Sequence, residues 1–350
     1  MIKDIRIKNY KSIQKLKITT GQLTVFIGEN GSGKTNILEA IALASAAAND
    51  KLDNEFLAAR GIRVTDPRFM RAAFNCENFS EDIYIRLTGA NDSYFECLLK
   101  NDNEPYSKWT INNAKNFQLD QNPKSIIEKL KLHNFLIYSP ENNALRVFEK
   151  EGQIQPLGIN GEGLFKLLKV LASEENNIRL EVIKEKLKVI GWFEDFEIPD
   201  SLFESIELIK IKDKYLHEKF SYINQKASNE GFLFLLFYFA LFVSNKTPDL
   251  FAIDNIDASL NPKLCWHLTK ELVKLAKQYN KQVILTTHNP AILDGLNLDD
   301  PQQKLYVVFR NKLGYTKIKQ IEKPKSDGQE PVRLSEAFLR GYIGGLPKGF

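Results

Sequence analysis

The sequence predicts an α/β fold with a mixed sheet and flanking helices, and three segments carry that prediction. An apolar run over 22–27 predicts a buried strand, and after a glycine-rich stretch the residues 36–43 predict a helix. Two further buried strands are predicted over 250–253 and 282–287, with an amphipathic helix over 263–279 between them. Strands that alternate with helices are typical of a parallel sheet covered by helices.

The glycine-rich stretch from Gly28 to Thr35 fits the phosphate-loop pattern G-x-x-x-x-G-K-[ST] at every fixed position. Its glycines allow main-chain N–H groups to turn toward a phosphate, and the helix that begins there adds partial positive charge. Lys34 is placed to reach the β- and γ-phosphates of a nucleotide, and the Thr35 hydroxyl to ligate Mg²⁺. The candidate nucleotide-binding residues of this loop are Asn30, Gly31, Ser32, Gly33, Lys34 and Thr35.

Three later segments add candidate residues. Ser228, Asn229, Glu230 and Gly231 precede the most apolar run of the chain, over 232–243, and Ser228 is expected to cap a helix there and to offer a second phosphate contact. At 12 residues this run is too short to span a membrane, so it predicts a buried core helix.

Two polar residues follow the predicted strands downstream of the loop. Asp254 ends an apolar strand, which is the Walker B pattern, and is expected to hold Mg²⁺ together with Thr35. His288 ends the next strand, where it is placed to sense the γ-phosphate. Strand pairs and helices are also expected elsewhere: pairs at 5–8 with 16–19, 82–88 with 94–100, 205–212 with 215–224 and 305–310 with 315–321, and helices at 163–173 and 179–189.

Composition narrows the class of protein. The 350 residues carry 48 basic and 44 acidic side chains. The resulting net charge of +4 is too small to indicate a nucleic-acid-binding protein by itself. Cys76, Cys97 and Cys265 are scattered and form no metal or disulfide pattern, which favours a reducing cytoplasm.

The order of the phosphate loop, Ser228–Gly231, Asp254 and His288 resembles the ABC-type ATPases of the SMC, RecF and OLD group. The segments 8–12 and 34–40 are similar to the sequence motifs of that group, and the resemblance extends from the start of the chain to about residue 310. The chain also resembles compact ATPases of bacterial anti-phage systems, of the Septu, PARIS and retron-associated types. The resemblance implies a P-loop NTPase of the ABC-ATPase head type with a helical signature lobe and no long coiled coil.

The resemblance also implies a mechanism and partners. Lys11 and Ser12 join the nucleotide-binding set, and two heads sandwich ATP and Mg²⁺ so that the loop of one copy faces Ser228–Gly231 of the other. A homodimer or higher oligomer would then regulate an effector, a nuclease or toxin from a neighbouring gene. The alternative is a RecF-like repair ATPase that clamps DNA, which leaves nucleic acid open as a partner; a transporter ATPase and a membrane partner are disfavoured.

Two departures from the family pattern affect the chemistry. Asn255 stands where the family has the glutamate that polarises water, and because an amide cannot accept a proton we expect slow hydrolysis. Asp257 is a candidate substitute for that base. Ser228 lies three residues before Gly231 rather than two, so Asn229 is an alternative phosphate-facing residue.

We expect a nucleotide-binding lobe over 1–100 and 245–325, a helical signature lobe with inserted strands over 101–244, and a tail over 326–350. A row of lysines at near-helical spacing follows Asp254 and is expected to be a solvated helix face, with a nucleic-acid or acidic-partner patch as the alternative. Its members are Lys263, Lys270, Lys274, Lys277 and Lys281.

Overall fold

The computed structural model describes residues 1–74, 78, 80–104, 107–117, 123–148, 154–199, 208–323 and 332–345. The described chain forms two compact units, the first from residues 1–137, 248–256 and 282–350, the second from 138–247 and 257–281. Residues 101–137 therefore belong to the first unit and 257–281 to the second, so both stretches fall outside the lobes in which we expected them. Cys76, residues 326–331 and 346–350 of the tail, and residues 205–207 of the expected strand lie outside the described residues.

A six-stranded sheet of the first unit carries the segments with the candidate residues, in the order β14-β13-β3-β12-β11-β7. Strand β3 pairs in parallel with both β12 and β13, β11 pairs in parallel with β12, and β14 is antiparallel to β13. The strands are β3 (Leu23–Ile27), β7 (Ile137–Tyr138), β11 (Leu250–Ile253), β12 (Gln282–Thr287), β13 (Gln303–Arg310) and β14 (Thr316–Ile321). Because β3, β11 and β12 are parallel, the segments that follow them emerge at one edge of the sheet.

A second, antiparallel sheet of the first unit has the order β2-β1-β4-β5-β6. Its strands are β1 (Asp4–Tyr10), β2 (Ile13–Thr19), β4 (Ile83–Thr88), β5 (Tyr94–Lys100) and β6 (Thr110–Phe117), and the expected pairings of the first four are confirmed. Apolar and polar residues alternate along them, so Ile5, Ile7 and Ile85 are buried on one face while charged residues occupy the other.

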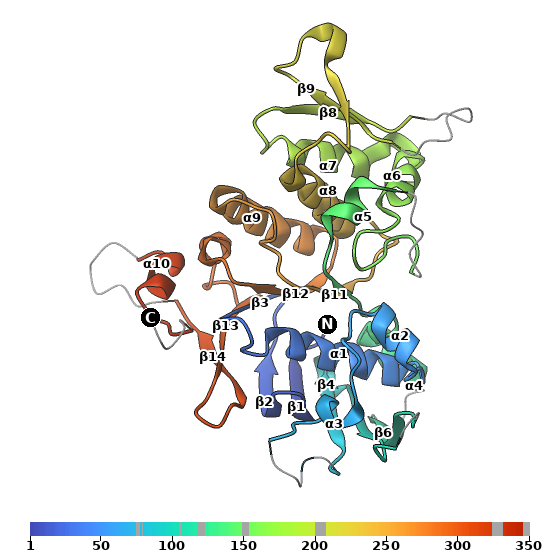
Figure 1. Cartoon of the computed structure of the whole chain (residues 1–350), viewed down its shortest axis with the longest axis vertical. Coiled ribbons are helices and arrows are strands. Elements are labelled where there is room, and N and C mark those ends of the chain that lie inside the picture. The colour runs from blue at the N-terminus through green and yellow to red at the C-terminus, as the bar shows by residue number, and fades with distance from the viewer. Residues whose placement is uncertain are drawn as a thin grey trace. The chain divides into compact units, whose positions relative to one another are not determined.

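Helix α1 (Lys34–Ala48) packs against strands of both sheets, and Figure 1 shows it beside β1 and β4. Since it is covered on more than one side, 13 of its 15 residues are buried, which explains its run of alanine, leucine and isoleucine. The other helices of the unit are α2 (Asn54–Ala59), α3 (Pro67–Met70), α4 (Pro123–Lys129) and α10 (Leu334–Leu339), with short 3-10 turns at Ala90–Asp92, Leu132–Asn134 and Pro290–Gly295.

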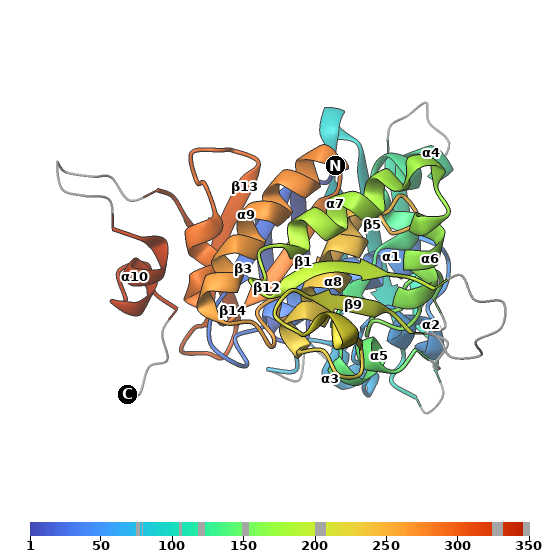
Figure 2. The ribbon, with the colours of Figure 1, turned by 90° about the horizontal axis from the view of Figure 1, so that it is seen from above.

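The second unit is built around α8 (Glu230–Val243), in which every residue from Phe232 to Val243 is buried, as expected for a core helix. Figure 2 shows α7 and α9 with α8, and α5 and α6 also contact α8. These helices are α5 (Asn142–Arg146), α6 (Leu164–Ala172), α7 (Ile178–Leu187) and α9 (Pro262–Gln278), with 3-10 turns at Glu175–Asn177 and Glu218–Phe220. A small antiparallel sheet contains β8 (Phe193–Glu197), β9 (Lys210–Asp213) and β10 (Tyr222–Asn224). No helix among the described residues is long and apolar enough to cross a bilayer.

Candidate functional site

The glycine-rich loop connects the end of β3 to the start of α1, as the motif requires. Gly33 is the N-cap of α1 with φ of 103°, no side chain caps the helix, and its first turn contains no acidic residue. The first N–H groups of a helix have no partner within the helix, and this 15-residue helix adds a partial positive charge at its N-terminus. The loop is therefore suited to an anion.

Two glycines of the loop lie too close to other backbone or side chains for a Cβ atom. A Cβ on Gly28 would lie 2.1 Å from the carbonyl oxygen of Val308, and one on Gly33 would lie 2.1 Å from Thr316 Oγ1. The Ser32 hydroxyl is buried and has no hydrogen-bond partner among the described residues. Tight glycines and an unsatisfied buried hydroxyl in one loop fit a phosphate group.

Lys34 and His288 meet beside this loop. The Lys34 ammonium donates to the carbonyl oxygens of Gly28 at 2.9 Å and Glu29 at 3.0 Å, and lies 3.4 Å from His288 Nδ1. Lys34 is only 5% exposed, so its charge is held within the loop. The structure thus brings together the lysine of the loop and the histidine that follows β12.

Asp254 lies at the end of β11 and contacts two hydroxyl groups. Thr35 Oγ1 donates to Asp254 Oδ2 at 2.8 Å, and Thr286 Oγ1 donates to Asp254 Oδ1. The Thr286 hydroxyl also accepts from the backbone N–H of Asn255 at 2.9 Å, while Asn255 has φ of 54° and an exposed side chain. A carboxylate and a hydroxyl at this distance provide the hard oxygen ligands that Mg²⁺ prefers.

A buried set of polar groups holds the loop from behind. Ser12 Oγ lies 2.6 Å from Thr316 Oγ1 and accepts from Asn36 Nδ2 at 2.6 Å, while Thr316 Oγ1 donates to the carbonyl oxygen of Ser32 at 2.8 Å. Ser12 is 4% exposed. Its hydroxyl therefore ties the β1–β2 turn and β14 to the loop through these contacts.

Lys11 belongs to a charge cluster around Glu39, whose carboxylate is completely buried in α1. Lys11 Nζ lies 2.6 Å from Glu39 Oε2, and Arg63 Nε lies 2.7 Å from Glu39 Oε1. Burial lowers the pKa of Lys11, and this effect exceeds the opposing effect of Glu39. Arg63 also donates to Asn36 Oδ1 at 3.0 Å, next to Thr35 in the chain.

Arg63 and Thr286 are residues that the sequence interpretation missed. Burial lowers the pKa of Arg63, but the hydrogen bond and charge of Glu39, with a contribution from Asp254, raise it overall. The signal for Arg63 was indirect: a glutamate inside an apolar helix needs a cationic partner. For Thr286, a hydroxyl at the end of an otherwise apolar strand was the available signal.

Ser228–Gly231 and Asp257 belong to the second unit, whereas the glycine-rich loop belongs to the first. The expectation that Ser228 caps α8 is wrong, because Asn229 is the N-cap and its Oδ1 accepts from the N–H of Phe232 at 2.8 Å. Ser228 is 3% exposed, and its hydroxyl has no partner among the described residues. Glu230 is exposed in the first turn of α8.

Asp257 and the expected lysine row also lie in this unit. Burial, followed by the charge of Asp257, raises the pKa of Tyr238. Four lysines of the row are exposed on α9, as expected for a solvated face, and one of them, Lys274, lies 2.7 Å from Glu271. Lys281 departs from the expectation, because it is 1% exposed and donates to the carbonyl oxygen of Thr247 at 3.0 Å. Lys270 lies over the ring of Trp266 at 3.9 Å.

The two described cysteines are buried, and burial raises the pKa of Cys97 and of Cys265 to about 12. Within the described ranges, no group of three or more histidine, cysteine and acidic residues could hold a metal ion by itself.

With this geometry, comparison with known proteins identifies the chain. The model of the AAA domain family (AAA_23) matches residues 4–283. The chain belongs to this family. Together with the relatives and neighbours below, the match makes it an ATPase of the SMC, RecF and OLD type.

Curated relatives of this ATPase match it over short stretches. The DNA replication and repair protein RecF of Ruminiclostridium cellulolyticum is 31% identical over 104 residues, 27% of this chain and 24% of that one. The OLD nuclease of Thermus scotoductus is 30% identical over 90 residues, 23% and 17% of the two chains. The Retron Vc95 probable ATPase of Vibrio cholerae is 28% identical over 123 residues, 33% and 22%. The matched stretches cover less than a quarter of each relative's length.

Solved structures match this ATPase over most of its length. An SMC head bound to the C-terminal winged-helix domain of ScpA has a TM-score of 0.61 at 16% identity and covers 92% of this chain and 98% of that one. An SMC head with an extended coiled coil, from Pyrococcus furiosus, has a TM-score of 0.57 at 13% identity, with 92% and 96% covered. At these identities the likeness establishes the fold, an SMC-head type of α/β ATPase, as the sequence predicted.

Proposed function

We propose that this ATPase binds ATP with Mg²⁺, hydrolyses it slowly, and regulates a separate effector, a nuclease or toxin, through ATP-dependent dimerisation in a bacterial anti-phage system. The observation that carries the nucleotide assignment is the meeting of Lys34, Thr35, Asp254 and His288 at one edge of the parallel sheet. The similarity to the Retron Vc95 probable ATPase supports the defence role.

The residues proposed to hold the nucleotide are the loop from Asn30 to Thr35, with Lys11 and Ser12 behind it. Thr35 and Asp254 would hold Mg²⁺, which when bound neutralises developing charge on the phosphates. Lys34 would exchange its carbonyl partners for phosphate oxygens, because a charged acceptor is the stronger partner for an ammonium. His288, beside Lys34, would report whether the terminal phosphate is present.

Slow hydrolysis rests on Asn255. Its backbone is fixed by the bond to Thr286 and its side chain is exposed, so the amide is available to a water molecule but cannot take its proton. Asp257 is the proposed alternative base. The ATP-bound state would therefore be long-lived, as a switch that holds an effector requires.

Dimerisation is proposed because the family resemblance implies a nucleotide held between two heads, and the segment expected to face it, Ser228–Gly231, lies at the N-terminus of a 14-residue helix of the second unit. That segment of one copy would contact the phosphates bound by the other, with Asn229 as the phosphate-facing residue. Binding of ATP by two copies together links dimer stability to nucleotide concentration.

The test measures mass and turnover in the same preparation. Light scattering should give the monomer mass of 40.1 kDa without nucleotide. With ATP and Mg²⁺ it should give twice that mass. Wild-type turnover should lie well below about 10 per second, and Asn255→Glu should raise it about 100-fold by restoring a base. Asn255→Gln, which keeps the amide, is the matched control. Unchanged turnover in Asp257→Asn would exclude Asp257 as the base.

The second candidate, a RecF-like ATPase that clamps DNA, is favoured by the RecF match. ATP turnover that duplex DNA stimulates in the absence of any partner protein would select it over effector regulation.

A further inference from the structure

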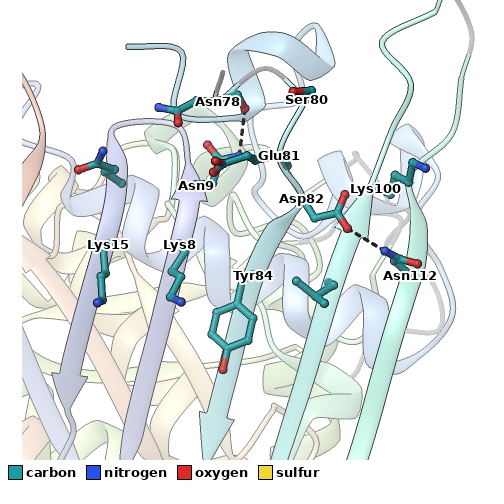
Figure 3. A pocket seen from close by; sticks show the side chains of 12 residues that line it. Lys8, Asn9, Lys15, Asn78, Ser80, Glu81, Asp82, Tyr84, Lys100 and Asn112 are labelled. Carbon is teal, nitrogen blue, oxygen red and sulfur yellow. Dashed lines mark hydrogen bonds between the residues drawn. The ribbon is translucent and has the colours of Figure 1, made fainter. Parts of the chain in front are cut away.

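The outward face of the antiparallel sheet in the first unit collects cations in direct register. Lys8 pairs with Lys15 across β1 and β2, Arg6 pairs with Lys17 on the same two strands, and Arg6 also faces Arg86 on β4. We call these five residues the basic sheet face. Figure 3 shows Lys8 and Lys15 side by side on their strands.

Little on this face neutralises these charges. Arg86 lies 3.5 Å from Glu96, whereas Arg6, Lys8, Lys15 and Lys17 form no ion pair with any carboxylate of the described chain. Like charges directly opposite each other destabilise a sheet. A sheet that nevertheless keeps three such pairs side by side is suited to an anionic partner.

A polar groove of about 800 Å³ opens beside Lys8 and Lys15 on the same sheet. It is lined mostly by lysine, amide and carboxylate side chains, including Lys100, Asn9, Gln14, Asn78, Asn112 and Asp82. In Figure 3 Asn112, on β6, donates to Asp82, which directly precedes β4, and the distance is 2.9 Å. The groove therefore combines cations with groups that both donate and accept hydrogen bonds.

The lining favours a polypeptide over a nucleic acid. Asp82 and Glu81 would repel any acidic chain, so a bound segment would lie along the lysines, and the amide side chains match the N–H and C=O groups of a peptide. A cation lies over each tyrosine ring, Lys8 at 5.2 Å from the Tyr84 centroid and Arg86 at 3.8 Å from that of Tyr94, so a base that stacked on that face would have to displace it.

We propose that the basic sheet face and the adjoining groove bind an acidic segment of a partner protein. The proposal rests on the proposed function, in which a separate effector is regulated, and it assigns the surface that the effector contacts. Electrostatic attraction speeds encounter, and the amides of the groove provide the hydrogen bonds that fix the segment.

The test uses a labelled peptide of about 15 glutamates as the probe, with single-stranded and duplex DNA as competing probes, in fluorescence anisotropy at moderate salt. Lys8→Gln with Lys15→Gln should weaken peptide binding about tenfold, since a charge pair facing the acidic chain is lost. Lys214→Gln with Lys219→Gln changes the net charge equally on exposed positions of the second unit and should leave binding unchanged.

A fold readout accompanies the binding data. Lys8→Gln with Lys15→Gln should raise the thermal midpoint, because it removes a repulsion from the sheet, so weaker binding is not a result of unfolding. Tighter binding of either DNA than of the peptide, equal loss of binding in the control variant, or no peptide binding would overturn the proposal. ATP-dependent dimerisation measured on the same variants tests the proposed function separately, since neither lysine contacts the nucleotide-binding residues.

Discussion

The N-termini of α1 and α8 were both predicted to contact phosphate, yet they differ in what already satisfies them. At α1, the cap is Gly33 in a left-handed conformation, without a capping side chain or an acidic residue in the first turn. At α8, Asn229 caps the helix through its side chain and Glu230 adds a negative charge. The first terminus is open to an anion, whereas the second has a cap and a counter-charge of its own.

This difference implies unequal roles. The α1 terminus would supply most of the phosphate affinity, and α8 would add a weaker contact that matters only when a second copy is present. The predictions below test that ranking, from the largest expected effect to the smallest.

Removing the ammonium at α1 should have the largest effect. Lys34→Ala should weaken ATP binding about 100-fold, because hydrogen bonds to charged groups contribute about 1.5–3 kcal/mol each. Isothermal titration with ATP and Mg²⁺ measures the change. Lys277→Ala, an exposed lysine of α9, is the control, and an equal loss in that variant would show that Lys34 has no special role.

The glycines of the two termini should respond differently to alanine. Gly33→Ala should lower the free energy of unfolding by about 2 kcal/mol, because alanine is strained at φ of 103° and its Cβ would overlap Thr316 Oγ1. Gly231→Ala should be nearly neutral, since the nearest atom to its Cβ is 3.6 Å away. Chemical denaturation measures the free energy of unfolding of both variants. Equal destabilisation would contradict the distinction between the two termini.

Asn229 can be tested without loss of its cap. Asn229→Asp keeps an oxygen that accepts from Phe232, so stability should hold, but its negative charge should weaken ATP-dependent dimerisation about tenfold. Asn229→Ala is the control: it loses about 1 kcal/mol of capping energy without adding a charge, so it shows how much lost stability alone weakens dimerisation. A dimer of unchanged affinity in Asn229→Asp would argue against a phosphate contact at α8.

Local pattern was enough to predict the α/β fold class and the loop, because hydrophobic periodicity and a fixed glycine spacing act within a few residues. The ATPase-head type was implied by the family resemblance. The cap of α8 was mispredicted because Ser228 and Asn229 are both good caps and only the backbone at each position distinguishes them.

Long-range partners were the second source of error. Thr316 contacts Ser12 across 304 residues of sequence. Lys281 can be buried because its ammonium donates hydrogen bonds to the carbonyl oxygen and the hydroxyl of Thr247, on another segment. No local pattern indicates such contacts. Glu39 in the apolar α1 did signal a buried partner, but the identity of Arg63 depends on the loop that follows α2.

The central claim is that two copies bind one triphosphate together, through the N-terminus of α1 in one copy and the N-terminus of α8 in the other. Mixing Lys34→Ala chains with Asn229→Asp chains tests it most directly, because a mixed dimer contains one pocket with neither substitution. The account predicts that each variant alone has little ATP turnover and that the mixture recovers it. A mixture no more active than the sum of its two components would contradict the claim.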